Sequence, residues 1–171
     1  EVVIPDKKIR MTQTQESGEW SGLKIIKEYE ISEEKAEVKV GLTLHNQGSK
    51  TLQVAQRIQN FINSEPGVYS WPTPDWLEIF QQPDNLLSGA NSVVNDLLRA
   101  GWAAKHYGKQ GVTLLFGFDV RAVRQSYAYI TSRRSTLEWY YRKIELPPGA
   151  NWRTECRISV LTGQKDYFAD A

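Results

Sequence analysis

TLEWYYRKIELPPGANWRTECRISV, residues 136–160, is the stretch that decides the fold class. In its second half, apolar or small side chains alternate with charged or polar ones. The first set consists of Trp152, Thr154, Cys156, Ile158 and Val160. Because successive side chains of a strand point to opposite faces, this alternation predicts a strand with one buried face. Trp139, Tyr140 and Tyr141 in the first half also favour a strand, since flat side chains pack well on a pleated surface.

Pro147, Pro148 and Gly149 separate the two halves. Proline lacks the backbone N–H that a ladder needs, so we expect strand pairing to stop there and the chain to turn. The sequence therefore predicts a hairpin of two strands, each about ten residues long.

Strand-like patterns recur through most of the chain. Residues 23–31, 36–46 and 51–62 are predicted to form an antiparallel meander of three strands. Further strands are predicted for residues 101–107, 112–118 and 126–131, and a short helix for residues 91–99. With so little helix between the strands, we expect an all-β fold, an antiparallel β-sandwich formed by residues 1–171 as a single domain.

The middle of the chain, residues 63–101, breaks this rhythm with several prolines and glycines. Trp71, Trp76 and Phe80 supply apolar bulk there, so we expect a long ordered loop and not a flexible linker. Long loops in compact domains are often functional, which makes this segment a place to look for binding residues.

Basic and acidic residues nearly balance, with 21 Lys and Arg against 20 Asp and Glu and a formal net charge of +1. No large single-sign field results, so we expect no nucleic-acid partner and no attachment to an anionic membrane. No apolar run approaches the ~20 residues of a membrane span, so we expect no membrane insertion and a soluble chain. The sequence begins with Glu1 and not with Met, which is typical of a processed secreted or periplasmic protein, or of a piece of a longer protein.

Cysteine and histidine are scarce. Cys156 is the only cysteine, which excludes an intrachain disulfide, and its place on the apolar side of a strand predicts a buried, unreactive thiol. The two histidines, His45 and His106, are too few for a zinc site with the usual ligands. The sequence has no Asp-rich loop of the kind that binds calcium. We therefore expect no metal site and no cofactor.

Three motifs follow one another along the predicted strands. They are Leu44, Asn46 and Gly48; then Trp102 and Ala103; then Leu146, Pro148 and Gly149. This succession resembles the galactose mutarotase-like (aldose epimerase-like) superfamily of carbohydrate-processing proteins, over roughly residues 23–163. The resemblance implies the supersandwich form of the β-sandwich, because the motifs are structural turns and strands. The chain is shorter than a full epimerase, which implies a trimmed relative or part of a longer protein.

The resemblance also implies where catalytic residues would lie. Active epimerases carry a glutamate general base on the strand before the L-x-PG turn, and Glu138 occupies a similar place. They carry a histidine general acid just before an aromatic pair, where this chain has no histidine between Arg57 and Phe61. Opening a sugar ring needs both a base and an acid, so the missing histidine predicts loss of catalysis, unless His106 is a relocated acid. The plainer interpretation of Glu138 is a surface glutamate or one paired with a nearby arginine.

Four further residues are candidates for carbohydrate binding. Arg57 and Gln59 lie on one face of a predicted strand, where they either hydrogen-bond sugar hydroxyls or simply face solvent. Trp71 and Trp76 lie in the proline-rich segment, and their rings are suited to stacking on the C–H surface of a sugar.

Three functions are consistent with these observations. The first is a non-catalytic carbohydrate-binding or accessory domain, whose partner is a carbohydrate or a neighbouring glycan-processing domain. The second is an active sugar epimerase with Glu138 as base and His106 as acid. The third is a structural domain that docks another protein through a sheet face.

Overall fold

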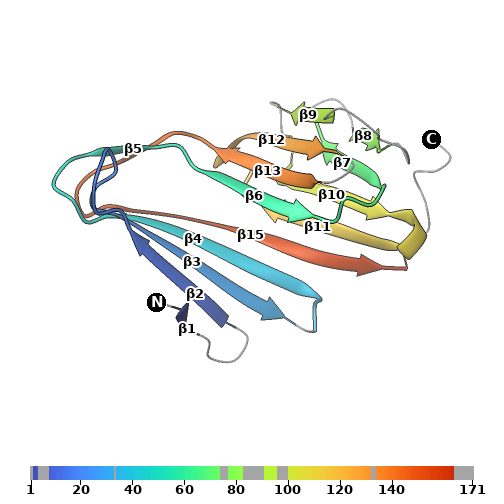
Figure 1. The fold of residues 1–171 in the computed structure, drawn as a ribbon, viewed down its shortest axis with the longest axis horizontal. Helices are drawn as coiled ribbons and strands as arrows, with labels where there is room; N and C mark the ends of the chain where they lie inside the picture. Colours follow the sequence, from blue (N-terminus) through green and yellow to red (C-terminus); the bar gives the residue numbers. More distant parts are fainter. Residues whose placement is uncertain are drawn as a thin grey trace. The chain divides into compact units, whose positions relative to one another are not determined.

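A computed structural model describes residues 2–3, 8–32, 34–73, 77–82, 91–95, 100–131 and 134–163. Antiparallel strands account for most of these residues, and the helical element among them is one 3-10 turn, Gly108–Gln110 (Figure 1). The predicted all-β fold is therefore confirmed.

The chain divides into two compact units. The first comprises residues 1–56 and 142–158, and the second comprises residues 57–141 and 159–171. The expectation that residues 1–171 form a single domain stays a prediction.

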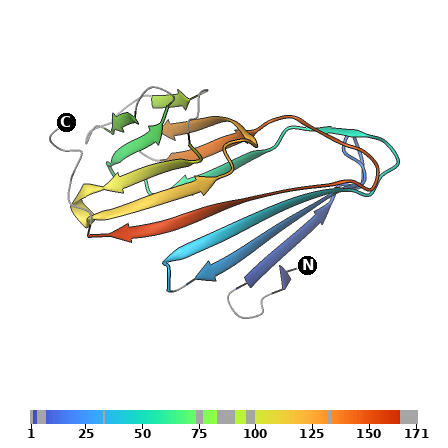
Figure 2. The same ribbon diagram turned by 180° about the vertical axis from the view of Figure 1, so that it is seen from behind.

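The first unit contains one sheet and one separate pair of strands. The sheet has the order β1 (Val2–Val3), β2 (Lys8–Thr14), β3 (Leu23–Ser32), β4 (Glu37–Asn46) and β15 (Asn151–Thr162), and β15 belongs to this unit up to Ile158. Figure 2 shows β2, β3 and β4 side by side. β5 (Leu52–Val54) and β14 (Ile144–Leu146) form the antiparallel pair. Val40, Leu42 and Leu44 alternate along β4 and are buried, as their spacing predicts.

The second unit is a β-sandwich of two sheets. One has the order β11 (Val112–Phe118), β10 (Trp102–Tyr107), β7 (Val68–Pro72) and β8 (Leu77–Gln81). The other has the order β6 (Arg57–Ile62), β13 (Ser135–Tyr141), β12 (Val123–Ile130) and β9 (Asn91–Asn95). The sheets pack through Trp139 of β13, whose ring centroid lies 5.0 Å from that of Phe118 and 6.1 Å from that of Phe116. This contact buries Trp139 completely, at 0% exposure.

Asn46 joins two of the sequence motifs within the first unit. Its Nδ2 donates to two backbone carbonyls, each at 2.7 Å, one of which belongs to Leu146. Its Oδ1 accepts from the N–H of Gly48 at 2.9 Å, and its carbonyl accepts from the N–H of Gly149 at 2.8 Å. Gly149 has a φ of +77°, a backbone conformation that favours glycine. The buried amide of Asn46 therefore holds the L-x-PG turn against the end of β4.

The predicted hairpin of residues 136–160 is wrong. β13 pairs with β12 and β6, β14 pairs with β5, and β15 lies beside β4. Alternation along one strand decides which face is buried but carries no information about the partner strand, so local pattern alone did not predict this pairing. Within β15 the alternation places Thr154 and Cys156 inside as expected, whereas Val160 is 38% exposed.

Two other segments also differ from expectation. β3 and β4 form the predicted antiparallel pair, but residues 51–62 break into β5 and β6, which pair with β14 and β13 and not with β4. Residues 63–101 contain β7, β8 and β9 where a loop was expected. The predicted helix is wrong for Asn91–Asn95, which pair with β12, and residues 96–99 lie outside the described ranges. Val93 and Val94 are β-branched, which favours a strand once a partner strand is available.

Candidate functional site

Polar and aromatic side chains gather on one face of the β6, β13 and β12 strands, which lie side by side in Figure 1. Glu138 of β13 lies opposite Gln59 of β6 and Tyr127 of β12, and Tyr140 of β13 lies opposite Arg57 of β6. Residues directly opposite one another in an antiparallel ladder point to the same side of the sheet. We call the surface formed by these five residues the Glu138 face. The other side of the sheet packs into the sandwich.

Glu138 is buried on this face, at 2% exposure, and its two oxygens differ. Oε1 accepts hydrogen bonds from Nε2 of Gln59 at 2.7 Å and from Oγ1 of Thr136 at 2.6 Å. Oε2 has no hydrogen-bond partner among the described residues. It forms an ion pair with Arg57, whose Nη1 lies 3.5 Å away. A buried carboxylate oxygen without a hydrogen bond costs folding free energy. Oε2 is therefore suited to accept a hydrogen bond from a ligand.

Arg57 reaches over this carboxylate from the edge strand β6. Its Nη1 donates to the hydroxyl oxygen of Tyr140 at 3.2 Å, and the guanidinium carbon lies 5.7 Å from the centroid of the Tyr140 ring. The hydrogen bond to Tyr140 and, less strongly, the charge of Glu138 raise the pKa of Arg57, which stays a cation. Its side chain is 49% exposed, so part of the guanidinium borders solvent next to Oε2.

The structure brings together three of the predicted site residues: Arg57, Gln59 and Glu138. The plainer interpretation of Glu138 as a surface residue is wrong, because two side-chain donors and the covering guanidinium remove it from solvent. Its ion pair forms with Arg57 across the sheet, and not with an arginine that is close in sequence.

His106 lies elsewhere in the second unit. It is 5% exposed in β10, and its Nδ1 hydrogen-bonds with Oγ1 of Thr113 at 2.8 Å. The inward face of β10 carries Lys105, which neighbours Tyr69, so His106 points to the outer side of that sheet. Glu138 points to the outer side of the other sheet, and both sheets therefore separate the two side chains. His106 is not placed to act as the acid partner of Glu138.

Of the two tryptophan candidates, only Trp71 lies within the described residues, and it is not part of this face. Trp71 lies in strand β7 and not in a loop, and it is only 4% exposed, so its ring offers no open face to a sugar. Trp76 lies outside the described residues.

Cys156, possible metal ligands and possible membrane spans were also considered in the sequence. Cys156 is buried as predicted, and burial raises the pKa of its thiol to about 12, so little thiolate forms near neutral pH. Within the described ranges no three His, Cys, Asp or Glu side chains lie close enough together to hold a metal ion. No helix in the same ranges has the length and apolarity of a membrane span.

Comparison with known proteins finds likeness in structure and none in sequence. No family model and no curated protein matches the sequence. A galactose mutarotase-like protein from Lactobacillus casei superimposes with a TM-score of 0.69 at 13% identity, over 94% of this chain and 72% of that one. A GalM/aldose epimerase homologue from C. elegans gives a TM-score of 0.68 at 11% identity, over 96% and 69%. A protein from Synechocystis sp. gives a TM-score of 0.71 at 9% identity, and this chain covers 65% of its length.

The fold is galactose mutarotase-like. The resemblance of the three motifs is thereby confirmed at the level of fold. In this mutarotase-like chain, Asn46 and Gly149 are turn residues that hydrogen-bond to one another, which explains why both motifs report on structure. The same fold places Glu138 on the strand that precedes the L-x-PG turn by one short strand, β14.

Sequence reasoning missed the aromatic part of the site in the mutarotase-like fold. Tyr127 and Tyr140 flank Glu138, and Thr136 donates to it, yet none of the three was a candidate. Their signal was available in the residue spacing. Thr136, Glu138 and Tyr140 alternate on one side of β13, and Tyr127 and Tyr129 do the same on β12.

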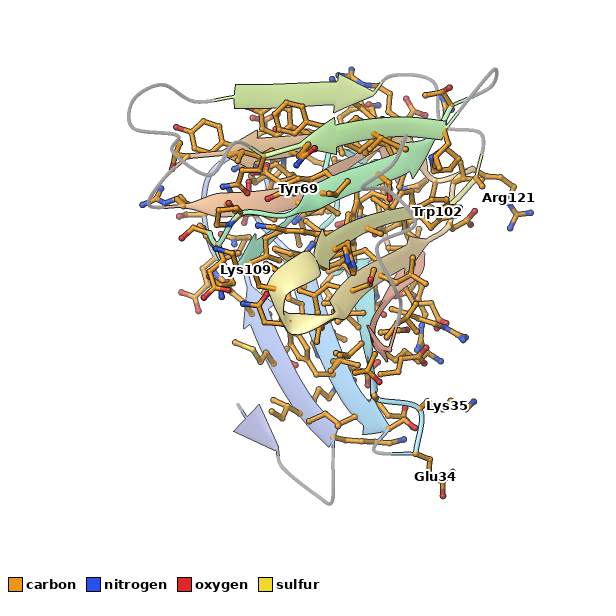
Figure 3. The ribbon with its side chains drawn as sticks, turned by 90° about the vertical axis from the view of Figure 1, so that its right-hand side faces the viewer. Glu34, Lys35, Tyr69, Trp102, Lys109 and Arg121 are labelled. Carbon is orange, nitrogen blue, oxygen red and sulfur yellow. The ribbon has the colours of Figure 1, made fainter. Side chains whose placement is uncertain are left out.

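A second buried cluster lies inside the sandwich, around Lys105. Its Nζ donates to the carbonyl of Asn63 at 2.7 Å and to Oε1 of Gln82 at 3.3 Å. The ammonium also lies 4.9 Å from the ring centroid of Tyr69, which is labelled in Figure 3, and 4.7 Å from that of Tyr107. Burial lowers the pKa of Lys105 to about 8, and the negative charge of Glu65 opposes this effect only in part. The cluster ties the ends of β6 and β8 to the core.

We expect Lys105 to contribute a gain in stability, on the order of 1–2 kcal/mol, as the pH rises from 8 to 10. The folded pKa of Lys105 is lower than the 10.5 of an ordinary lysine, so between these values the unfolded chain binds more protons and deprotonation favours the folded state. Burial raises the pKa values of Tyr69, Tyr107 and Cys156, so these groups lose protons first in the unfolded chain and oppose the gain, but they do so equally in a variant that lacks only Lys105. Denaturant unfolding at pH 8, 9 and 10 measures the gain. The gain is the rise in stability of the wild type relative to the Lys105→Met variant, and an equal pH dependence of the two proteins would contradict the assignment.

Proposed function

We propose that the Glu138 face binds a carbohydrate and does not open the sugar ring. The observation that carries the proposal is the buried Oε2 of Glu138, which has no hydrogen bond among the described residues and lies beside the cation of Arg57. A sugar hydroxyl is a neutral donor of the kind this oxygen needs, and its own oxygen accepts a hydrogen bond in return. Carboxylate, guanidinium and amide groups placed next to tyrosine rings match the mixed polar and apolar surface of a sugar.

The absence of ring opening is proposed from the position of the acid and base groups. Ring opening requires one group that takes the anomeric proton and another that protonates the ring oxygen. Glu138 would supply the base in such a reaction, but His106 lies on the outer side of the other sheet of the second unit. The described part of the Glu138 face contains no histidine.

A second candidate function is an active sugar mutarotase or epimerase in which Glu138 is the general base. The same Oε2 favours it, because a base needs a free oxygen directed at its substrate. In that case the acid would have to come from a residue other than His106.

The chain spans 65% of the length of the Synechocystis relative and 72% of the Lactobacillus casei one. The first proposal therefore includes an accessory role, in which the bound glycan is processed by a neighbouring domain. Carbohydrate affinity of the chain by itself is the property to measure first.

Replacing Glu138 with glutamine is expected to weaken saccharide binding by about tenfold, because a hydrogen bond to a charged acceptor is exchanged for one to a neutral acceptor. Calorimetric titration with mono- and disaccharides chosen on a glycan array measures the change. Glu145→Gln is the matched control, since Glu145 also faces a glutamine, Gln53, across a strand pair but is exposed and lies in the first unit. Equal affinities of the two variants would contradict the proposed site.

Anomer interconversion followed by NMR separates the two functions. The binding proposal predicts that saturating protein leaves the spontaneous rate unchanged, with or without Glu138→Gln. A rate increase that Glu138→Gln abolishes and Glu145→Gln does not would establish the enzyme in its place.

A further inference from the structure

Phe61 is the most exposed large apolar residue among those described, at 66% exposure. It occupies β6 two positions beyond Gln59 and four beyond Arg57, so its side chain lies on the same side of the strand as both. The neighbouring residues Ile58 and Ile62 point the other way and are half-buried. An aromatic ring therefore continues the polar row of the Glu138 face toward the end of β6.

The ladder places Phe61 close to the buried carboxylate. Phe61 lies opposite Thr136 of β13, the residue whose hydroxyl donates to Glu138. Two residues along a strand correspond to roughly 6.6 Å, which separates the Phe61 position from that of Gln59. A single ligand is thus able to touch the ring and the Gln59–Glu138 pair at the same time.

Arg134 lies over the Phe61 ring. Its guanidinium carbon lies 5.9 Å from the ring centroid of Phe61, within the range of a cation–π contact. This contact restrains the orientation of the exposed ring. With 66% of the residue still exposed, a large part of the ring remains open to solvent.

Single exposed apolar residues are ordinary on protein surfaces and need no explanation in themselves. Phe61 differs because it is adjacent to a charged and hydrogen-bonding group that is incompletely satisfied. A ligand with hydroxyl donors at one edge and C–H groups on one face would complete both features. A pyranose has this chemistry.

We propose that Phe61 is the stacking platform of the site and selects saccharides that present an unbroken C–H face. This inference rests on the proposed carbohydrate function and adds to it the residue that sets specificity. The sugar ring covers Phe61, while its hydroxyls reach Gln59 and Oε2 of Glu138. Removal of apolar surface from water makes the stacking favourable, and the hydroxyl contacts fix the orientation.

The test compares Phe61→Ala and Phe61→Tyr with the wild type in calorimetric titrations against the saccharides that bind. Phe61→Ala is expected to weaken binding by about tenfold, and Phe61→Tyr to retain it, because tyrosine keeps the ring. Ile79→Ala is the matched control, since Ile79 is an apolar residue of the second unit that is also exposed, at 40%. It should leave affinity unchanged.

Saturation-transfer NMR supplies a second readout. Irradiation of aromatic protons should mark the C–H protons of one sugar face in the wild type, and Phe61→Ala should lose this pattern. Thermal unfolding checks that each variant is folded. We expect all of them to fold, because Phe61 and Ile79 are exposed and their replacement leaves the core intact. Saccharide binding that is equal in Phe61→Ala and wild type overturns this inference and leaves the proposed function standing, whereas a wild type that binds no saccharide overturns both.

Discussion

Replacing Asn46 with alanine is expected to lower the free energy of unfolding by about 3–4 kcal/mol. Asn46 is fully buried at 0% exposure, and its side chain makes three hydrogen bonds to backbone groups. Alanine would leave two carbonyls and the N–H of Gly48 without these partners. Each loss costs about 1–3 kcal/mol where water cannot enter and less where it can, and two of the three bonds are only part-buried. Chemical denaturation measures the change.

Asn60→Ala is the matched control for this prediction. Asn60 also donates from Nδ2 to a strand carbonyl, that of Leu137, at 2.9 Å, but it makes this bond alone among those recorded for its side chain. We expect a loss of about 1 kcal/mol for that variant. Asn46→Asp should be nearly as damaging as Asn46→Ala at neutral pH, because it replaces the donor with an oxygen that faces two carbonyl oxygens. A similar cost for Asn46→Ala and Asn60→Ala would show that Asn46 does not hold the L-x-PG turn.

Replacing Trp139 with alanine is expected to destabilise the fold by about 3–5 kcal/mol. The indole is fully buried between the sheets of the second unit, stacked on Phe118 and edge-on to Phe116. Its Nε1 also donates to the hydroxyl oxygen of Tyr141 at 3.1 Å. Alanine leaves a cavity that the surrounding strands fill only in part, because their backbone ladders fix their spacing. A loss of this size is a large fraction of the ~5–15 kcal/mol by which proteins are stable.

Trp20→Ala is the comparison for Trp139→Ala, since it deletes the same side chain from a turn where the residue is 44% exposed. We expect a change within about 0.5 kcal/mol for that variant. Urea unfolding of both, followed by circular dichroism, tests the contrast. Comparable losses for the two tryptophans would contradict the packing of the second unit around Trp139.

The candidate site could be predicted only in part. The alternation of β6 placed Arg57 and Gln59 on one face, and the resemblance drew attention to Glu138, so these three were within reach of the sequence. Their meeting was not, because Gln59 and Glu138 are far apart in the chain and touch only through the pairing of β6 with β13. The same reason explains the wrong hairpin, the wrong third strand of the meander and the misplaced partnership of His106 with Glu138.

The sequence was also a poor guide to which aromatic residues are exposed. Trp71 lies in the proline-rich segment and Phe61 at the end of a strand-like run. From the sequence, the tryptophan was the candidate for contact with a ligand and the phenylalanine was not. Burial reverses that order, since Trp71 is 4% exposed and Phe61 is 66% exposed. Burial depends on what packs against a strand, and that is decided by segments elsewhere in the chain.

The sequence by itself determined most of the strands outside residues 63–101, and several of their turns and buried faces, because side-chain alternation, prolines and glycines act over a few residues. It determined that Val40, Leu42 and Leu44 are inside and that the L-x-PG turn needs a glycine, which has a φ of +77°. Only the tertiary structure decided which strands pair, and therefore that Glu138 is buried with Gln59, Thr136 and Arg57 around it. Every strand has several possible partners, and the pairing that forms is the one that gives the whole chain the most favourable set of hydrogen bonds and apolar contacts.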